Sequence, residues 1–511
     1  MQILCFSIAK IRFFHDKHYV SNKKTRCIIF IDFIFVLLQT IMNIRRLFIF
    51  ISLAFSCLAQ AQPISLETLK RIGLPVVVVE TIDAEEPTCE YLTPDEGFPG
   101  YSIRNETKVP GRVQVIKGDS TIYDSGNYEE DISGMTIKIR GNGHAFLQKK
   151  PFKIKLQKKA DMIGNNNHYK DKNWVLLKDE NPSINLMVGL KVNELVGLQW
   201  TPRFRYVNLV FNGDYRGVYM LCESVKRNNN CRLNVSDSGF IFEYDPYWWK
   251  ENLWFKSNMS ERKYTFKYPD EDNVTEEQLQ YLIDYMTKVD LSLYDGKYNQ
   301  YIDLESFATW VLAHDILGTY DASGSNIFIT KYDDGDSTKL MMANMWDFDS
   351  IEQTPDKFSM VHINTGGFYP YPLFHSQNKA FTKTYIARWK EVKTKVFEEM
   401  EKLLNDFASS ELSTALESSR SLDFKRWETT GPTVAENIES NKIWFSDRKI
   451  WLENAISEME KEIESQTPIV SIKSESLENK HKKYNLQGQL ILNLNHNHRG
   501  IIIENGHKYL K

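Results

Sequence analysis

The sequence predicts an α+β fold with two lobes, a strand-rich lobe followed by a helical one. In residues 135–156, apolar and polar side chains alternate with the period of two that is typical of half-buried strands. The pair Asn212-Gly213 stands between two apolar runs and is the strongest short signal for a β-hairpin. Residues 384–464 consist almost entirely of helix-forming residues. Strands therefore come first along the chain and helices second.

The same patterns predict further elements. The run LPVVVVETID from Leu74 predicts a buried strand, and Lys-Gly-Asp at 117–119 predicts a hairpin turn. Residues 185–198 carry apolar side chains at helical spacing. Amphipathic helices are expected from Thr275, a candidate N-cap with an acidic first turn, and from Asp303.

The composition is that of a globular protein with a large core. Of the 511 residues, 42% are hydrophobic and 25% are charged, which excludes an intrinsically disordered chain. The net charge of −4 provides no basic excess, so we expect no nucleic-acid partner.

The N-terminal region has the pattern of an exported protein. The segment that begins at Met42 contains two arginines, an apolar run and the motif Ala-Gln-Ala at 59–61, which together are typical of a secretory signal peptide. We expect the mature chain to begin near Gln62, with no stable membrane span, and to reside in the periplasm, at the cell surface or outside the cell. Two alternatives stay open: residues 1–41 could form a membrane anchor, and Cys57 could carry a lipid.

The cysteines limit the disulfides that the exported chain can form. Only Cys89, Cys222 and Cys231 follow the expected cleavage site. An odd number allows one disulfide at most. No C-x-x-C motif or His/Cys cluster is present, so a zinc site is not expected.

The expected organisation has six parts. A mis-assigned upstream extension (1–41) and the signal peptide (42–61) come first, then an N-terminal β-rich region (62–134), the main domain (135–465), a polar linker (466–483) and a short C-terminal β module (484–511).

Three polar residues are predicted to meet at one end of a hairpin. Asn326 precedes an apolar strand, a turn of sequence YDDGDS follows, and the returning strand leads to Asp347. In a hairpin the start of the first strand and the end of the second lie side by side. Asp321 lies on the loop that enters the same end, five positions before Asn326.

Two carboxylates and an amide oxygen are ligands that suit Mg²⁺, which leaves positions open for phosphates. A base Asp, an Asn five residues later and a hairpin to a metal-binding Asp is the arrangement of a protein-kinase active site. An ordinary Asx turn at Asp321 is the alternative interpretation. Asp349 competes with Asp347 as the metal ligand.

A kinase also requires a cation for the nucleotide phosphates. In the run KKPFKIKL, Lys153 and Lys155 point to one face of a strand by alternation, and Lys155 is the first choice. Its acidic partner is expected to be Glu223, at the end of an apolar strand, or Glu194, on the following helix. The residues leave this choice open.

Several motifs together resemble the CotH kinases, a group of atypical secreted or spore-coat protein kinases. The resemblance covers about 135 to 460 and rests on RGNG, which begins at Arg140, on KKPFKIKLQKKADMIG, KNWVLLKDEN and TPRFRYVNLVFNGDYRGVYMLCESVKR, and on GTYDASGSNIFI and MWDFDS. It implies a bilobal protein-kinase-like fold, ATP with Mg²⁺ or Mn²⁺, and phosphorylation of serine or threonine in a secreted or surface protein.

Carried over by the resemblance, Asp321 occupies the catalytic-base position, and Asn326 and Asp347 the metal positions. The nucleotide set comprises Lys155, Lys153, Arg140, Glu223 and Glu194. The chain departs from the family where Gly143-His144 follow RGN and where NPSINLMVG lacks an expected Arg.

The C-terminal stretch YNLQGQ…GIIIENGHKYLK resembles sorting modules of secreted Gram-negative proteins. Two other functions stay open: a non-catalytic surface or assembly protein that keeps the kinase fold, and phosphorylation of a carbohydrate or small molecule. Autophosphorylation would separate the first from the kinase.

Overall fold

The computed structural model describes residues 64–92, 102–104, 107–179, 182–363, 368–466, 483–484, 501–504 and 507–510. The expected upstream extension, the signal peptide and almost all of the polar linker lie outside these residues. In the described part, Cys89, Cys222 and Cys231 are free thiols, so the one disulfide that the sequence allowed is not formed.

The first large element of the fold is an eight-stranded sheet that closes on itself. Strand β1 (Val76–Thr81) pairs in parallel with β9 (Phe204–Phe211) on one side and antiparallel with β4 (Val109–Lys117) on the other. The second pairing closes the sheet through β4, and β5 is left as an edge strand that pairs with β4. The remaining strands are β5 (Ser120–Asp124), β6 (Met135–Ile139), β7 (Phe152–Ala160), β8 (Asp171–Lys178) and β10 (Asp214–Glu223).

The alternating apolar residues point into this closed sheet, as the pattern predicted. Met135, Ile137 and Ile139 of β6 face Ile154 and Leu156 of β7 in one buried cluster. The hairpin at Asn212-Gly213 is confirmed: both residues have positive φ, 48° and 79°, between β9 and β10.

The boundary expected near residue 135 is not a structural one. Strands β1, β4 and β5 are hydrogen-bonded into the same sheet as β6 to β10. The N-terminal β-rich region is therefore part of the larger domain, because β1 supplies the strand that closes it.

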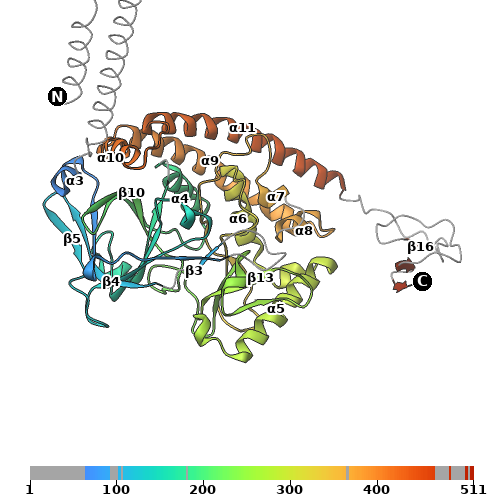
Figure 1. The fold of residues 1–511 in the computed structure, drawn as a ribbon. Coiled ribbons are helices and arrows are strands. Elements are labelled where there is room, and N and C mark those ends of the chain that lie inside the picture. Colours follow the sequence, from blue (N-terminus) through green and yellow to red (C-terminus); the bar gives the residue numbers. More distant parts are fainter. Residues whose placement is uncertain are drawn as a thin grey trace, which may run out of the picture. The chain divides into compact units, whose positions relative to one another are not determined.

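A second, five-stranded sheet in the order β12-β13-β11-β14-β15 carries the predicted hairpin. The hairpin joins β14 (Ile327–Lys331) to β15 (Leu340–Met342), with Ile329 opposite Met342. The other strands are β11 (Phe240–Tyr244), β12 (Trp254–Lys256) and β13 (Lys263–Tyr268). Strand β13 and helix α5 (Glu276–Asp295) are labelled below the centre of Figure 1.

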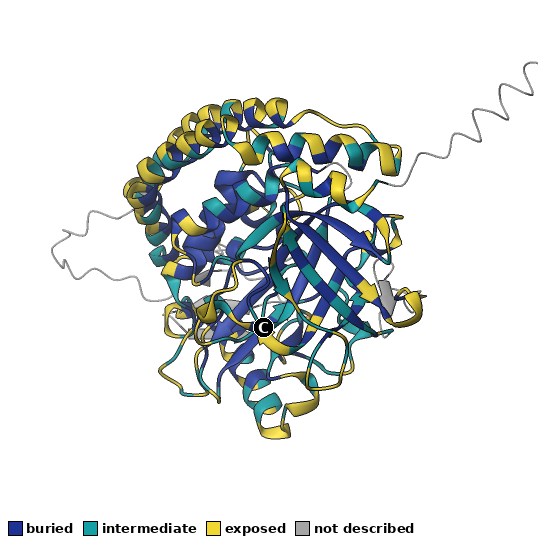
Figure 2. Cartoon of the chain, turned by 90° about the vertical axis from the view of Figure 1, so that its left-hand side faces the viewer, coloured by how far each residue is buried: buried dark blue, intermediate teal, exposed yellow. Residues whose placement is uncertain are grey.

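Helices cover the second half of the chain, as expected. The long helices α9 (Ala380–Ala408), α10 (Glu411–Trp427) and α11 (Val434–Gln466) lie together at the top of Figure 1, and Figure 2 shows that they alternate buried and exposed faces. Helix α5 begins with the predicted cap, where the Thr275 hydroxyl accepts from the Gln278 N–H in a capping box. The shorter helices are α3 (Leu66–Ile72), α4 (Asn185–Val196), α7 (Met360–Ile363) and α8 (Pro370–His375).

Helix α6 (Leu304–Leu317) differs from its prediction. We expected an amphipathic helix, but every residue from Ser306 to Leu317 is buried. The reason is that α4 and α9 pack against it and the hairpin strand β15 lies on it as well. A helix that is buried all round gives a fixed platform for the loop that follows it.

Short elements complete the described chain. They are β2 (Glu90–Leu92) with β3 (Ser102–Arg104), the three strands β16 (Lys483–Tyr484), β17 (Ile501–Glu504) and β18 (His507–Leu510), and the 3₁₀ turns η1 (Ile82–Ala84), η2 (Gly143–Phe146), η3 (Asn167–Tyr169), η4 (Trp248–Lys250), η5 (Glu271–Asn273) and η6 (Tyr298–Gln300).

Candidate active site

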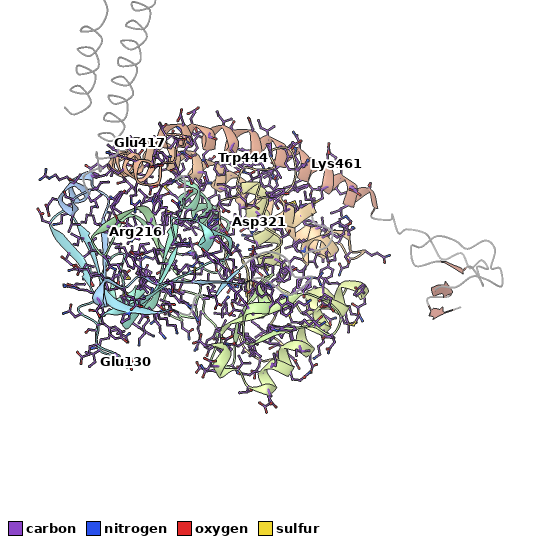
Figure 3. All side chains as sticks on the ribbon, viewed as in Figure 1. Glu130, Arg216, Asp321, Glu417, Trp444 and Lys461 are labelled. Carbon is purple, nitrogen blue, oxygen red and sulfur yellow. The ribbon has the colours of Figure 1, made fainter. Side chains whose placement is uncertain are left out.

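The loop that carries Asp321 begins where α6 ends. Gly318 terminates the helix with φ of +60°, and a Cβ at this position would lie 2.4 Å from the ring of Trp444. Only glycine meets both conditions without strain. Figure 3 labels Asp321 and Trp444. The Asp321 N–H donates to the Ser350 hydroxyl at 3.2 Å, which ties the loop to the segment after the hairpin.

A buried network fastens the end of α6. The Asp315 carboxylate accepts hydrogen bonds from the Ser359 N–H (2.8 Å) and hydroxyl (2.8 Å) and from the Tyr385 hydroxyl (2.7 Å). The Asp315 carbonyl accepts from Nε of Arg448 at 2.8 Å. Through Tyr385 and Arg448, helices α9 and α11 fix the end of α6 from which the Asp321 loop starts.

The hairpin brings Asn326 and Asp347 together, as the sequence predicted. Nδ2 of Asn326 donates to Oδ2 of Asp347 at 3.1 Å. Both residues face the cleft that also contains Asp321 and Asp349. To place its oxygen on a cation instead, the Asn326 amide would have to rotate about its terminal bond.

Both members of this pair have strained backbones. Asn326 has φ of +60° and Asp347 has φ of +69°, in the left-handed region. Such a conformation costs of order 1–3 kcal/mol for a residue other than glycine, although Asn and Asp tolerate it best. Two such residues are in contact at this end of the hairpin.

We expect Asn326→Gly to keep or raise the free energy of unfolding, by up to about 1 kcal/mol, because relief of strain outweighs the entropy that glycine costs. The same variant should bind divalent cations more weakly. Glu428→Gly, at an exposed position with φ of +54° after α10, is the matched control and should change stability only. Chemical denaturation and a cation titration measure the two quantities. A large loss of stability in Asn326→Gly would contradict the assignment of strain.

Phe348 orients the two neighbouring carboxylates. Its ring is buried against α4 at Gly189, where a Cβ would lie only 1.9 Å from the ring. The absence of a side chain at Gly189 therefore lets Phe348 anchor the segment. Asp347 and Asp349, on either side of it, are left facing the cleft.

The carboxylates perturb one another. Burial, followed by the charge of Asp349, raises the pKa of Asp347 to about 7, although solvent still reaches it through the cleft. A hydrogen bond from His144 lowers the pKa of Asp349, and Nε2 of His144 lies 3.1 Å from its Oδ2. Burial and then Asp349 raise the pKa of Asp321. The site therefore concentrates negative charge that a bound cation would relieve.

The opposite wall of the cleft is cationic. Lys153 of β7 stands directly opposite Lys138 of β6, a like-charge pair that destabilises a sheet. Burial first, and then the neighbouring cations Lys226, Lys138, Lys267 and Arg140, together lower the pKa of Lys153 to about 7. Lys226 and Lys267 already pair with Asp270 and Glu243, each at 2.7 Å, so Lys153 is the cation of this group that a bound anion would most favour.

Residues from both sheets line a single cleft of about 1530 Å³. Its charged lining on the side of the closed sheet includes Lys138, Arg140, Lys153, Lys155 and Lys178, and on the side of the hairpin it includes Asp321, Asp347 and Asp349. Arg140 lies over the ring of Trp346 at 5.9 Å, next to the acidic cluster.

The two expected acidic partners of Lys155 are elsewhere. Glu223 pairs in register with Trp174, which in turn faces Ile154, so Glu223 points to the opposite face of the sheet from Lys153 and Lys155. There its carboxylate accepts from the Arg203 N–H at 2.9 Å. Glu194 is exposed on α4 and pairs with Lys191 at 3.1 Å. The expected ion pair with Lys155 is therefore not formed by either residue.

Lys155 itself is exposed at the cleft, whereas Lys153 is half-buried. The structure thus puts Lys153, rather than the first choice Lys155, deeper in the cleft. Sequence reasoning missed Lys138, Lys226 and Lys267. Lys138 stands in the same alternation as Arg140 and could have been found, but Lys226 and Lys267 reach the cleft only through the packing of the two sheets.

Among the residues that the structure describes, no group of three His, Cys, Asp or Glu side chains is placed to hold a metal ion; the candidate pair here combines Asp347 with an amide. No helix in the described ranges is both long and apolar enough to cross a membrane.

The chain is similar to one protein family and, more weakly, to solved structures. A family model described as CotH kinase protein matches residues 137–452, more than half of the chain. The HipA, HipB and operator DNA complex of Shewanella oneidensis MR-1 aligns at 12% identity over 75% of this chain and 74% of that one, with a TM-score of 0.26. The Helicobacter pylori proinflammatory kinase CtkA aligns at 9% identity over 61% and 95%, with a TM-score of 0.23. Such TM-scores are too low to establish a shared fold. No curated protein matches the chain.

Proposed function

The chain belongs to the CotH kinase family, and from this premise we propose that it transfers the γ-phosphoryl group of ATP to a serine or threonine hydroxyl of a protein. The observation that carries the proposal is the opposition of two walls in one cleft. Lys138, Arg140 and Lys153 line it on the side of the closed sheet, and Asp321, Asn326 and Asp347 line it on the side of the hairpin. In this interpretation the closed sheet and the helical half act as the two lobes of a kinase-like fold.

The residues present fit a divalent cation and a nucleotide. Asp347 and Asn326 provide oxygen ligands beside a concentration of negative charge, which suits Mg²⁺ or Mn²⁺. When bound, the cation would bridge the protein to the phosphates and neutralise charge on them. Lys153 would hold the phosphates, with Lys155 at the outer edge of the cleft and Arg140 beside the acidic cluster.

Asp321 would orient the acceptor hydroxyl and accept its proton. Its carboxylate is on the loop that enters the site and makes no ion pair in the described structure. Burial and Asp349 raise its pKa, which makes it a better proton acceptor than an ordinary carboxylate. Glu223 and Glu194 have no role in this proposal, because neither lines the cleft.

Export remains part of the proposal and rests on the signal pattern at 42–61. The acceptor would then be a secreted or surface protein. Intact-mass measurement of the chain recovered outside the cytoplasm would find a start near Gln62; a chain that retains residues 1–41 would contradict it.

The pKa of Lys153 leads to a pH prediction. It lies at about 7 in the nucleotide-free protein, against 10.5 for an ordinary lysine. Bound phosphates would raise it, so binding above pH 7 takes up a proton. We therefore expect nucleotide affinity to fall as the pH rises above about 7, measured by calorimetry in buffers of different ionisation enthalpy.

Two variants check this assignment. Lys153→Arg should bind without that pH dependence, because arginine stays protonated. Lys155→Arg, on the same strand face, should retain it. In the unliganded protein the unfolded chain binds more protons than the folded one between pH 7 and 10.5, so Lys153 makes stability rise with pH across that window. If the pH dependence of nucleotide affinity is unchanged in Lys153→Arg, a cation other than Lys153 holds the phosphates.

The direct test is phosphotransfer. The purified chain is incubated with ATP and Mg²⁺ or Mn²⁺, alone and with secreted proteins, and phosphorylated residues are mapped by mass spectrometry. Phosphoserine or phosphothreonine that requires Asp321 supports the kinase. Nucleotide binding without any transfer would favour the non-catalytic alternative.

A further inference from the structure

The loop between β6 and β7 contributes residues to the lining of the cleft. It comprises residues 141–146, contains the 3₁₀ turn η2, and begins at Gly141 with φ of +87°. Gly141, Asn142, Gly143 and His144 line the cleft. It is also held within the β6–β7 connection, where Nζ of Lys150 donates to the Ala145 carbonyl at 2.7 Å.

The tip of this loop is held from the opposite wall by two separate contacts. Nζ of Lys250, in the turn η4 between β11 and β12, donates to Oδ1 of Asn142 at 2.5 Å. Nε2 of His144 lies 3.1 Å from Oδ2 of Asp349, after the hairpin. The two contacts come from different segments of the second half of the chain, so they fasten the loop on both sides.

The position of these contacts relative to the site is specific. Asp349 is two residues from Asp347, and both line the cleft. Arg140, at the base of the loop, lies over Trp346, the residue before Asp347. The loop therefore joins the cationic wall to the acidic wall beside the Asn326–Asp347 pair.

We propose that the 141–146 loop closes the cleft over the phosphate end of the bound nucleotide, and that Lys250, His144 and Asp349 are the positioning residues that hold it closed. Asp349 is then a partner of the loop, whereas Asp347 alone of the two aspartates binds the cation. The role of the loop as a cover for nucleotide rests on the proposed function. The assignment of the residues that hold the loop is independent of that function.

Closure of this kind keeps water from accepting the phosphoryl group and slows the exchange of nucleotide. A nucleotide that enters or leaves must break both contacts. Loss of either contact should therefore speed release. Asp321 and Asp347 take part in neither contact, and the packing of Phe348 against Gly189 anchors the segment that carries Asp347.

Hydrogen exchange of the full chain without nucleotide tests the holding contacts. The amides of Ala145 and Leu147 are bonded within the loop, to the carbonyls of Asn142 and His144. In Lys250→Met and in His144→Asn they should exchange about tenfold faster, equivalent to about 1.4 kcal/mol of local opening energy. Lys250→Arg should restore protection. Lys256→Met, which removes an exposed pair with Glu261, is the matched control and should have no effect.

Unchanged exchange at these two amides in both Lys250→Met and His144→Asn would overturn the proposal. If the wild-type chain binds no nucleotide while the exchange results hold, the proposed function fails and the loop assignment stands.

Nucleotide release provides the second measurement. Dissociation of a fluorescent ATP analogue should be about tenfold faster in His144→Asn and in Asp349→Asn, and the double variant should match either single one, because both remove the same contact. Cation affinity should survive in Asp349→Asn. If Asp349→Asn instead loses the cation as Asp347→Asn does, Asp349 is a ligand and its assignment to the loop is wrong.

Discussion

Replacing Asp347 with asparagine is expected to weaken Mg²⁺-nucleotide binding by about 10- to 100-fold and to abolish phosphotransfer. The affinity estimate follows from the loss of one charge-assisted contact, worth about 1.5–3 kcal/mol. Cation and nucleotide affinity should fall together, because the cation bridges the carboxylate to the phosphates. Asparagine keeps the size of the side chain and tolerates the φ of +69° at this position, so the fold should survive.

The matched control is Asp131→Asn. Asp131 is exposed and has φ of +57°, outside the cleft, so its replacement repeats the chemical change without touching the site. Calorimetric titration of MgATP into each variant provides the measurement. If Asp347→Asn binds at full affinity while Asp349→Asn does not, the kinase interpretation survives and the ligand moves two residues along the chain.

Asp321→Asn is expected to separate binding from turnover. Nucleotide should still bind, because the carboxylate belongs to the loop after α6 and not to the Asn326–Asp347 pair. The rate of phosphotransfer should fall by about 10²–10⁴, the usual contribution of a general base. Since the transition state of phosphoryl transfer needs little assistance from a base, part of this loss would reflect poorer positioning of the acceptor.

Asp336→Asn tests whether the effect is local. Asp336 is exposed in the turn at the far end of the same β14–β15 hairpin and should leave turnover unchanged. Single-turnover assays at saturating nucleotide compare the two variants. Wild-type phosphotransfer by Asp321→Asn would remove Asp321 from the reaction and favour the interpretation of its loop as an ordinary Asx turn.

Local patterns in the sequence determined the elements of the site. A hairpin necessarily brings its two ends together, so the contact between Asn326 and Asp347 could be predicted from the strand–turn–strand pattern alone. Alternation likewise placed Lys153 and Lys155 on the same face of β7. Both features depend on neighbours within the same hairpin or strand, and the helices from 380 onward were predictable for the same reason.

Only the tertiary structure decided how deep each residue lies and which partner it meets. Glu223 was one of two candidate partners for Lys155, but the register of β10 on β8 and of β8 on β7 turns it to the other face. Other features of the site also depend on packing that the local pattern does not specify. They are the greater depth of Lys153 than of Lys155, the like-charge pair of Lys153 with Lys138, and the contact of His144 with Asp349. Alternation specifies the face of a strand, whereas depth and partner depend on the register and packing of distant segments, which no local period encodes.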